Sequence, residues 1–198
     1  MITPGKYLVF LPTVWYNIAM FKAINKSFRN GDFSHISENM RWYIAGFLDG
    51  EGYFGLLKVN QTTPRKGQTS SFYYYPVVKV LNTNKEIMDI LQSLLGGYYF
   101  LRSFKNNKWK DAHSLEFKSG KRILPLLKWL YPCLIVKKPV CGILIEFLEW
   151  QYEQDSIRTH RSQAKGLRGY NEDEQKKKEE YYQKCKTFTA RGTAVTTK

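Results

Sequence analysis

Two acidic residues, Asp49 and Glu51, alternate with Gly50 and Gly52 at the end of an apolar run of the chain. The apolar residues before them recur at the three-to-four spacing of one buried helical stripe: Ile44, Phe47 and Leu48. This spacing, with Ser37 as the N-cap, predicts a helix from about residue 38 to residue 49. A carboxylate at the end of a helix lies beside the negative pole of the helix dipole and requires a nearby cation. The chemistry that these residue types suggest is therefore binding of a divalent metal by Glu51.

Gly46 and Gly50 stand four residues apart on one face of the predicted helix, with Ala45 beside them. Glycine inside a helix costs about 1 kcal/mol relative to alanine. The explanation that we favour is close approach of a second helix. The alternative is that Gly50 and Gly52 only end the helix and that Glu51 is a solvated surface residue.

The nine residues from Ile44 to Gly52, I-A-G-F-L-D-G-E-G, resemble the signature of the LAGLIDADG homing endonucleases. The resemblance implies an α+β fold. Its αββαββα core would carry an antiparallel, saddle-shaped DNA-binding sheet, with extra N- and C-terminal helices. It also implies that Glu51, with Gly50 beside it, binds Mg²⁺ at the scissile phosphates, and that Asp49 helps to finish the helix. The implied interface with a second core comprises Ala45, Gly46, Asp49 and Gly50.

Composition supports a polyanion-binding protein with a sizeable core. The 198 residues are 43% hydrophobic and 16% aromatic, and the net charge is +14 with a pI near 9.6. A ribosomal or membrane-surface protein would be equally basic, so charge alone does not name the chemistry. The three cysteines and three histidines show no zinc-ligand spacing, and the odd cysteine count argues for a reducing compartment. No segment is long and apolar enough to span a membrane.

Periodicity predicts the order α-β-β-α-β-β-α with a further helix, without reference to any family. The expected strands are 53–61, 71–81, 98–104 and 110–117, and the expected helices after the first are 84–95, 121–130, 140–150 and 171–186. We expect Pro125 to break the second of these helices and Pro139 to begin the third. We expect the chain to divide into an extension of unknown role (1–35), the endonuclease core (36–150) and a basic helical tail (151–198), and we expect the tail to be disordered from about residue 190.

The two predicted hairpins carry most of the positive charge in the middle of the chain. Residues 53–113 contain nine lysines and arginines against three acids. A β-ribbon with polar side chains on its open face fits the major groove of DNA, whereas the alternative is a solvated sheet face. The candidate DNA-contacting residues are Gln61, Arg65, Lys66, Gln68, Tyr73, Tyr75, Lys79, Arg102, Lys105, Lys108, Lys110 and Lys138. Which strand residues face the bases stays open, because the first strand does not alternate cleanly.

Only one copy of the signature is present, so the resemblance implies a homodimer with a long, near-palindromic target. The family also places a lysine and a polar amide near the attacking water. Lys137 matches the lysine, with Lys138 as the fallback, and Asn82 matches the amide. As alternatives, Asn82 only caps the following helix and Lys137 only contacts a phosphate.

The leading hypothesis is a site-specific homing endonuclease that makes a divalent-metal-dependent double-strand break and promotes intron mobility. The implied cofactor is Mg²⁺, with Mn²⁺ or Ca²⁺ as substitutes in binding. The implied partners are double-stranded DNA and a second copy of the chain. We expect no membrane partner. Two alternatives stay open: an RNA maturase of the same fold, whose partner is intron RNA, and a non-catalytic DNA-binding regulator. The location is intracellular, without a choice between chloroplast, mitochondrion and prokaryotic cytoplasm.

Overall fold

The structure, a computed structural model, describes residues 31–60, 72–103, 110–161 and 172–189. Its elements are α2 (Glu38–Glu51), β1 (Gly52–Asn60), β2 (Phe72–Asn82), α3 (Lys85–Leu95), β3 (Tyr98–Arg102), β4 (Ala112–Lys118), α4 (Gly120–Leu130), the 3-10 turn η1 (Tyr131–Cys133), α5 (Lys138–Arg161) and α6 (Glu172–Thr189). The fold is α+β, and the predicted αββαββα order is confirmed, followed by two further helices. The predicted N-terminal extension, up to residue 30, lies outside the described residues.

Helix α2 begins at the predicted cap and ends two residues later than predicted. The Ser37 hydroxyl accepts a hydrogen bond from the backbone N–H of Met40 at 3.3 Å. At the other end, the N–H of Gly52 donates to the carbonyl of Leu48. A Cβ atom on Gly52 would lie 2.4 Å from that carbonyl oxygen, so only glycine fits. Glu51 is therefore the last residue of the helix.

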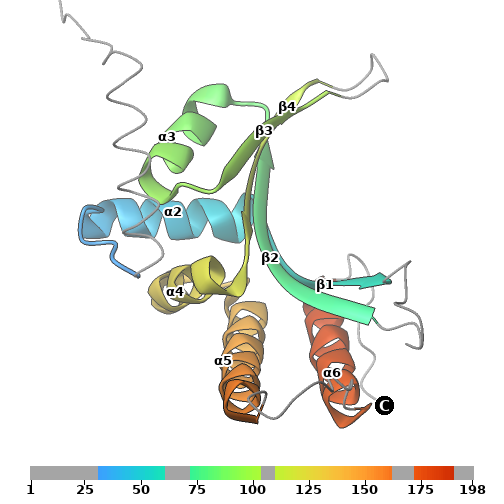
Figure 1. Cartoon of the computed structure of the whole chain (residues 1–198). Helices are drawn as coiled ribbons and strands as arrows, with labels where there is room; N and C mark the ends of the chain where they lie inside the picture. The colour runs from blue at the N-terminus through green and yellow to red at the C-terminus, as the bar shows by residue number, and fades with distance from the viewer. Residues whose placement is uncertain (1–30, 61–71, 104–109, 162–171, 190–198) are drawn as a thin grey trace, which may run out of the picture.

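The four strands form one antiparallel sheet in the order β1-β2-β4-β3. Both predicted hairpins are present, and pairing of β2 with β4 joins them. The β1–β2 pairing runs without interruption from Gly52–Val80 to Asn60–Phe72, so no bulge reverses the two faces. Figure 1 shows that β1 and β2 curve strongly along their length.

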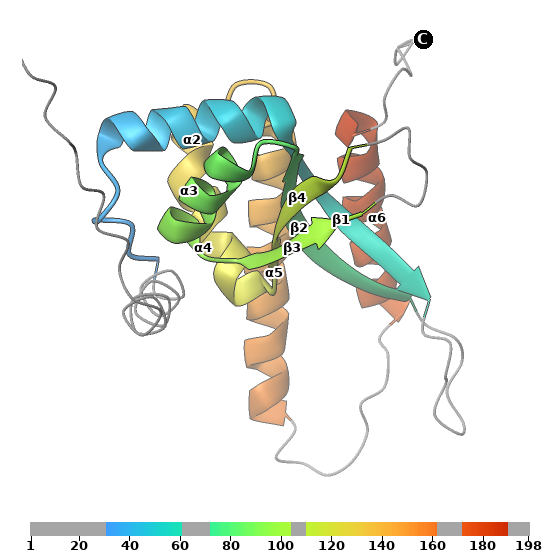
Figure 2. The same ribbon diagram turned by 90° about the horizontal axis from the view of Figure 1, so that it is seen from above.

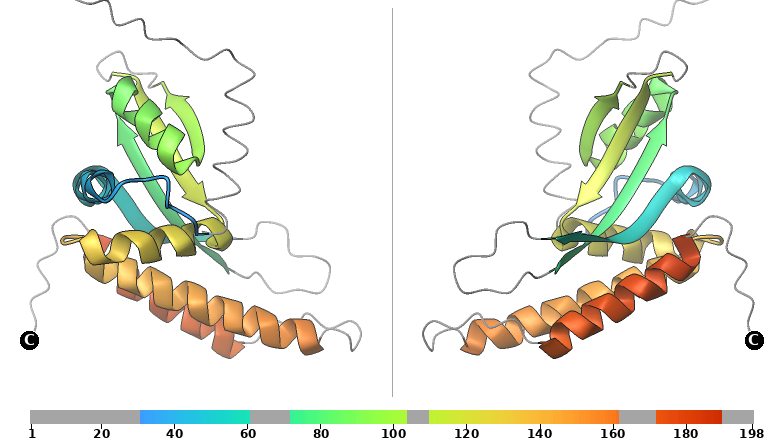
Figure 3. Two further views of the ribbon diagram at one scale, coloured as in Figure 1. Left: turned by 90° about the vertical axis from the view of Figure 1, so that its left-hand side faces the viewer. Right: turned by 90° about the vertical axis from the view of Figure 1, so that its right-hand side faces the viewer.

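The two faces of the sheet have different environments. One face carries core residues such as Phe54, Val78 and Phe117, which pack with buried residues of the helices. Figures 1 and 3 show the described helices on this side of the sheet. The strand residues of opposite parity form the other face, which no described helix covers; we call it the open face. On β2 the open face includes Tyr73, Tyr75 and Lys79.

The prediction that Pro125 breaks its helix is wrong, because α4 continues from Gly120 to Leu130. Proline removes one backbone donor from the helix. Four apolar residues of α4 are buried in the core, and their burial outweighs that loss: Ile123, Leu126, Leu127 and Leu130.

Helices α5 and α6 lie side by side beneath β1 and β2 (Figures 1 and 2). Helix α5 runs through residue 150, its predicted end, to Arg161. Tyr181 of α6 is buried, with its ring 5.6 Å from that of Phe147 and 6.0 Å from that of Trp150. Glu179 accepts hydrogen bonds from Lys58, at 2.7 Å, and from the Tyr74 hydroxyl. Helix α6 therefore packs on the core rather than extending from it.

Packing also begins before α2, since Phe33 is buried and its ring stacks 4.5 Å from that of Trp129. All three cysteines are buried thiols, as expected for a chain without a disulfide framework: Cys133, Cys141 and Cys185. Among the described helices, none combines the length and hydrophobicity that a membrane crossing requires.

Candidate functional site

The two carboxylates of the signature lie in different environments at the end of α2. Leu48 is fully buried, whereas Asp49 is partly buried and Glu51 is exposed. Because Glu51 is the last helical residue, it lies among carbonyl groups that have no partner within the helix. The exposed carboxylate of Glu51 is therefore accessible to a ligand, whereas the partly buried carboxylate of Asp49 is less accessible.

Asp49 joins α2 to the turn that precedes α5. Its carboxylate accepts backbone N–H bonds from Ile135 at 2.9 Å, Val136 at 2.8 Å and Lys137 at 2.7 Å. Burial tends to raise the pKa of the Asp49 carboxyl, but these three bonds and the charge of Lys137 outweigh burial and hold the pKa below its ordinary value of 3.8. Asp49 is thus an ionised brace within one chain.

Lys137 provides the cation that the end of α2 requires. Its ammonium donates to the carbonyl of Asp49 and lies 3.5 Å from the carbonyl oxygen of Gly50. Burial lowers the pKa of the Lys137 ammonium, and the charges of Asp49 and Glu51 oppose that effect only in part. The ammonium of the fallback residue, Lys138, instead lies 5.3 Å from the centre of the Tyr131 ring. Of the two lysines, Lys137 is the one beside the acids.

Asn82 is the last residue of β2, two positions beyond the Gly52–Val80 pair at the end of α2. Its side-chain oxygen accepts the N–H of Asn84 at 2.8 Å. The cap of α3 is Asn84, whose side chain accepts the N–H of Ile87 at 3.3 Å. Asn82 therefore orders the turn without capping the helix itself.

The oxygen atoms at the end of α2 fit a hard cation in type but not in number. Mg²⁺ prefers about six oxygen ligands, including water and phosphate. One chain offers the Glu51 carboxylate and the Gly50 carbonyl, the latter shared with Lys137. Nowhere in residues 31–60, 72–103, 110–161 or 172–189 do three acidic, histidine or cysteine side chains gather as potential metal ligands.

The solvent face of α2 is apolar. Trp42 is 52% exposed and Tyr43 is 49% exposed, and the Tyr43 ring lies 6.5 Å from that of Phe47. A Cβ atom added to Gly46 or Gly50 would meet no packing neighbour within 4 Å. This α2 face is therefore an apolar surface with space beside its glycines.

The four residues predicted at the interface divide into two pairs. Gly46 and Gly50 lie on the α2 face, whereas Ala45 is fully buried and Asp49 is bonded within its own chain. Ala45 has no surface to offer to a second chain. Trp42 is not among the residues predicted at the interface. Its spacing to Gly46 and Gly50, at i, i+4 and i+8, nevertheless places it on the same face of the helix.

The predicted DNA-contacting residues are described in part. Tyr73, Tyr75, Lys79 and Arg102 lie on the open face, as the strand register shows. Lys110 is exposed just before β4. The remaining hairpin residues lie outside the described residues: Gln61, Arg65, Lys66, Gln68, Lys105 and Lys108. A buried acid of the open face, Glu116, was not predicted, because a single charge in a strand carries no signal of burial.

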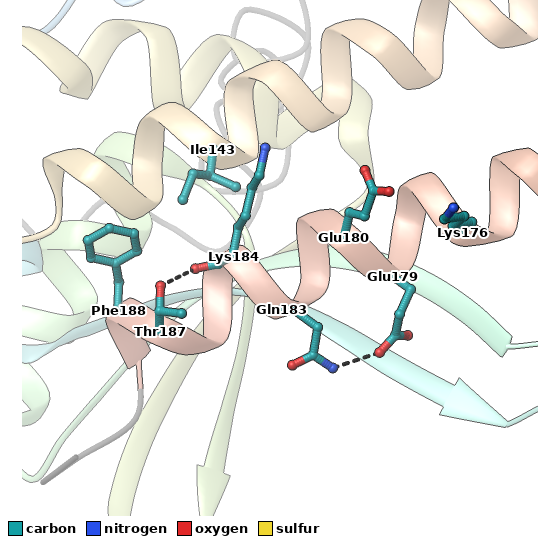
Figure 4. A pocket seen from close by; sticks show the side chains of 8 residues that line it. All are labelled: Ile143, Lys176, Glu179, Glu180, Gln183, Lys184, Thr187 and Phe188. Carbon is teal, nitrogen blue, oxygen red and sulfur yellow. Dashed lines mark hydrogen bonds between the residues drawn. The ribbon is translucent and has the colours of Figure 1, made fainter. Parts of the chain in front are cut away.

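A shallow groove of about 780 Å³ lies between α5 and α6, lined by Ile143 and by residues of α6 (Figure 4). Gln183 in this groove donates to Glu179, and the Thr187 hydroxyl donates to the carbonyl of Lys184. Of the predicted site residues that the structure describes, none lines the groove.

Comparison with family models and with curated proteins finds no match. The solved structures similar to this chain include several homing endonucleases. The archaeal intron-encoded homing endonuclease I-Vdi141I, complexed with DNA, is 17% identical, with 77% of this chain and 99% of that chain covered and a TM-score of 0.48. I-CvuI in complex with the I-CreI target is 17% identical, with 55% and 65% covered and a TM-score of 0.45. The LAGLIDADG homing endonuclease I-GzeII in complex with its DNA target is 15% identical, with 60% and 37% covered and a TM-score of 0.45.

This chain thus spans about two thirds of the I-CvuI chain and little more than a third of the I-GzeII chain. With TM-scores below 0.5, these similarities add nothing about activity to what the site itself shows.

Proposed function

We propose that this chain is a DNA endonuclease of the LAGLIDADG homing type that acts as a homodimer with Mg²⁺. It would make a site-specific double-strand break in a long, near-palindromic target and so promote intron mobility. The observation that carries the proposal is the end of α2. There the exposed carboxylate of Glu51 directly follows Asp49 and Gly50, whose carbonyl oxygens lie at the Lys137 ammonium. The solvent face of the same helix is apolar and has space beside its glycines.

In the proposed reaction, the Glu51 carboxylate and the Gly50 carbonyl would hold a divalent cation, which when bound would supply Lewis-acid chemistry to the phosphate and the attacking water. The Lys137 ammonium, already partly desolvated, would bind a phosphate oxygen and balance the charge that develops there. The amide of Asn82 would orient the water from the end of β2. In this proposal Asp49 would not contact the substrate; its carboxylate accepts the backbone N–H of Lys137 and so would hold Lys137 in place.

Two chains are proposed because one chain provides one exposed signature acid, whereas a double-strand break involves two phosphates. The α2 face offers the contact surface. Two copies that pack along Gly46 and Gly50 would cover the exposed aromatic residues Trp42 and Tyr43, and bring their Glu51 residues to one seam.

The catalytic proposal is tested with Glu51→Gln, and with Glu153→Gln as a control that removes the same charge from an exposed position on α5. Targets are selected by binding from a pool of randomised duplexes and are cloned into a plasmid. We expect the wild type and Glu153→Gln to make one Mg²⁺-dependent double-strand break. Glu51→Gln should bind the target in Ca²⁺ without cutting it. Cleavage by Glu51→Gln at the wild-type rate would contradict the proposal, and binding without cleavage by the wild type would favour the regulator.

The dimer is tested with Gly46→Leu, which fills the space on the α2 face. Ser93→Leu is the control, since it adds the same side chain to an exposed position on α3. In sedimentation equilibrium we expect dimers for the wild type and the control, and a dissociation constant raised about tenfold or more for Gly46→Leu. A wild-type monomer at micromolar concentrations, or an unaffected Gly46→Leu dimer, would contradict the interface.

A further inference from the structure

A carboxylate lies in the middle of the face that the proposed function assigns to DNA. Glu116 of β4 is 4% exposed and is the one charged side chain that is buried in the part of the chain that the structure describes. On the open face it stands between Lys79 of β2 and Tyr98 of β3, its two cross-strand neighbours. Burying an unpaired charge is costly, so the burial of the Glu116 carboxylate requires cationic partners nearby.

Three cations surround this carboxylate. The Arg102 guanidinium donates to one oxygen at 3.1 Å, and the Lys118 ammonium lies 2.6 Å from the other. Burial tends to raise the pKa of Glu116, but the bond and charge of Lys118, with the charges of Arg102 and Lys79, outweigh burial and lower the pKa below its ordinary value. Glu116 is therefore ionised at neutral pH and removes one unit of positive charge from the DNA-facing surface.

The ion pair fixes the direction of the Arg102 side chain. Arg102 is paired with Ala112, four pairs along the β3–β4 ladder from Tyr98–Glu116 and on the same face of the sheet. To reach Glu116, the guanidinium lies back over β3, with its carbon 5.5 Å from the centre of the Phe100 ring. Arg102 keeps 43% of its side chain exposed. A guanidinium has five donors, and the bond to Glu116 uses one of them, so the others remain for an acceptor above the sheet.

We propose that Glu116 is a positioning residue for base reading, which holds the Arg102 guanidinium so that its remaining donors meet the acceptor edge of a guanine in the major groove. The inference rests on the proposed DNA-binding function and names how one base pair in each half-site is read. Arginine paired in this way gives the commonest specific contact with guanine. An arginine released from its carboxylate samples many orientations and binds phosphates without regard to sequence.

This role predicts two effects of opposite sign for Glu116→Gln. Loss of the brace lowers the preference for guanine at one base pair. Loss of the negative charge raises affinity for DNA of any sequence and steepens its salt dependence, because one more cation is available to phosphates. A purely structural role would instead weaken binding to all sequences alike.

The experiment compares the full chain with Glu116→Gln, Arg102→Ala and the double variant. Each is used to select from a pool of randomised 30-base-pair duplexes in Ca²⁺, and binding to one random-sequence duplex is measured over a salt series. We expect both single variants to lose about tenfold in guanine preference at the same base pair, with no further loss in the double variant. On the random-sequence duplex, Glu116→Gln should bind several-fold more tightly than the wild type and Arg102→Ala more weakly.

Arg102→Lys keeps the charge on an exposed side chain but not the planar fork, so it tests the inference without disturbing a buried group. It should lose the same guanine preference with an unchanged salt dependence. Wild-type preference in Arg102→Lys, or a uniform loss of affinity in Glu116→Gln, would overturn the inference while leaving the nuclease assignment intact. A wild type that enriches no sequence would overturn both.

Discussion

The brace formed by Asp49 leads to a prediction about stability. Asp49→Asn removes the charge that three backbone N–H groups of the turn before α5 share, at 2.7 to 2.9 Å. Hydrogen bonds to a charged group contribute roughly 1.5–3 kcal/mol each. The site is partly solvated and the asparagine oxygen still accepts one or two of the bonds, so the loss is smaller than the sum. We expect the free energy of unfolding to fall by about 2–4 kcal/mol at pH 7.

The pH dependence gives this prediction its sign. The folded pKa of Asp49 lies below the ordinary value of 3.8, so its contribution is present above that pH and is lost as the pH falls through the folded pKa. The difference between the wild type and Asp49→Asn should be constant from pH 7 to about pH 5 and should shrink below pH 4.

Urea unfolding followed by tryptophan fluorescence measures the difference at each pH. Glu153→Gln, an equal charge change on exposed α5, should stay within about 0.5 kcal/mol of the wild type. A value for Asp49→Asn within the same margin at pH 7, or a difference that grows toward low pH, would refute the brace.

Two further predictions concern α2 and α6. Gly52→Ala should lower the free energy of unfolding by roughly 1–2 kcal/mol or more, because the added Cβ would lie 2.4 Å from the carbonyl oxygen of Leu48. Gly50→Ala adds a Cβ that meets no neighbour, so it should leave the free energy of unfolding of the single chain unchanged or slightly higher. Equal losses for the two variants in urea unfolding would contradict the packing described. Glu179→Gln should lower the free energy of unfolding by roughly 1–2 kcal/mol, because it removes the negative charge of the ion pair with Lys58 and leaves only a weaker amide acceptor. Burial raises the pKa of Glu179, but its hydrogen bonds outweigh burial and lower it to about 2, so the loss should appear above pH 4.5 and vanish as the pH approaches 2, in thermal unfolding followed by circular dichroism.

The elements predicted from sequence are those whose signals are local. Helix α2 and its Ser37 cap follow from spacing, and the two hairpins follow from breakers between β-rich runs. The brace from Asp49 joins residues 86 to 88 positions apart, and no local pattern encodes such a contact. That Lys137 lies at the end of α2, where its ammonium donates to the carbonyl of Asp49, follows from no local pattern either; the catalytic role expected for it comes only from the family resemblance and stays a prediction.

The ends of α5 and the docking of α6 were harder to predict for a different reason. After Trp150 the sequence of α5 becomes polar, so the apolar period that marked the helix ends before the helix does. Helix α6 is highly charged, and its buried side is narrow. Tyr181 and Cys185, four residues apart, mark that side, and both are buried.

The burial of the three thiols gives the protein built-in reporters of local opening. Burial raises the pKa of Cys141 and Cys185 to about 12, so almost no thiolate exists at pH 8 and alkylating reagents react only when the surrounding segment opens. Cys141 lies on α5 and Cys185 on α6. Their separate labelling rates, read by mass spectrometry, would therefore compare how often each helix leaves the core, without any engineered probe.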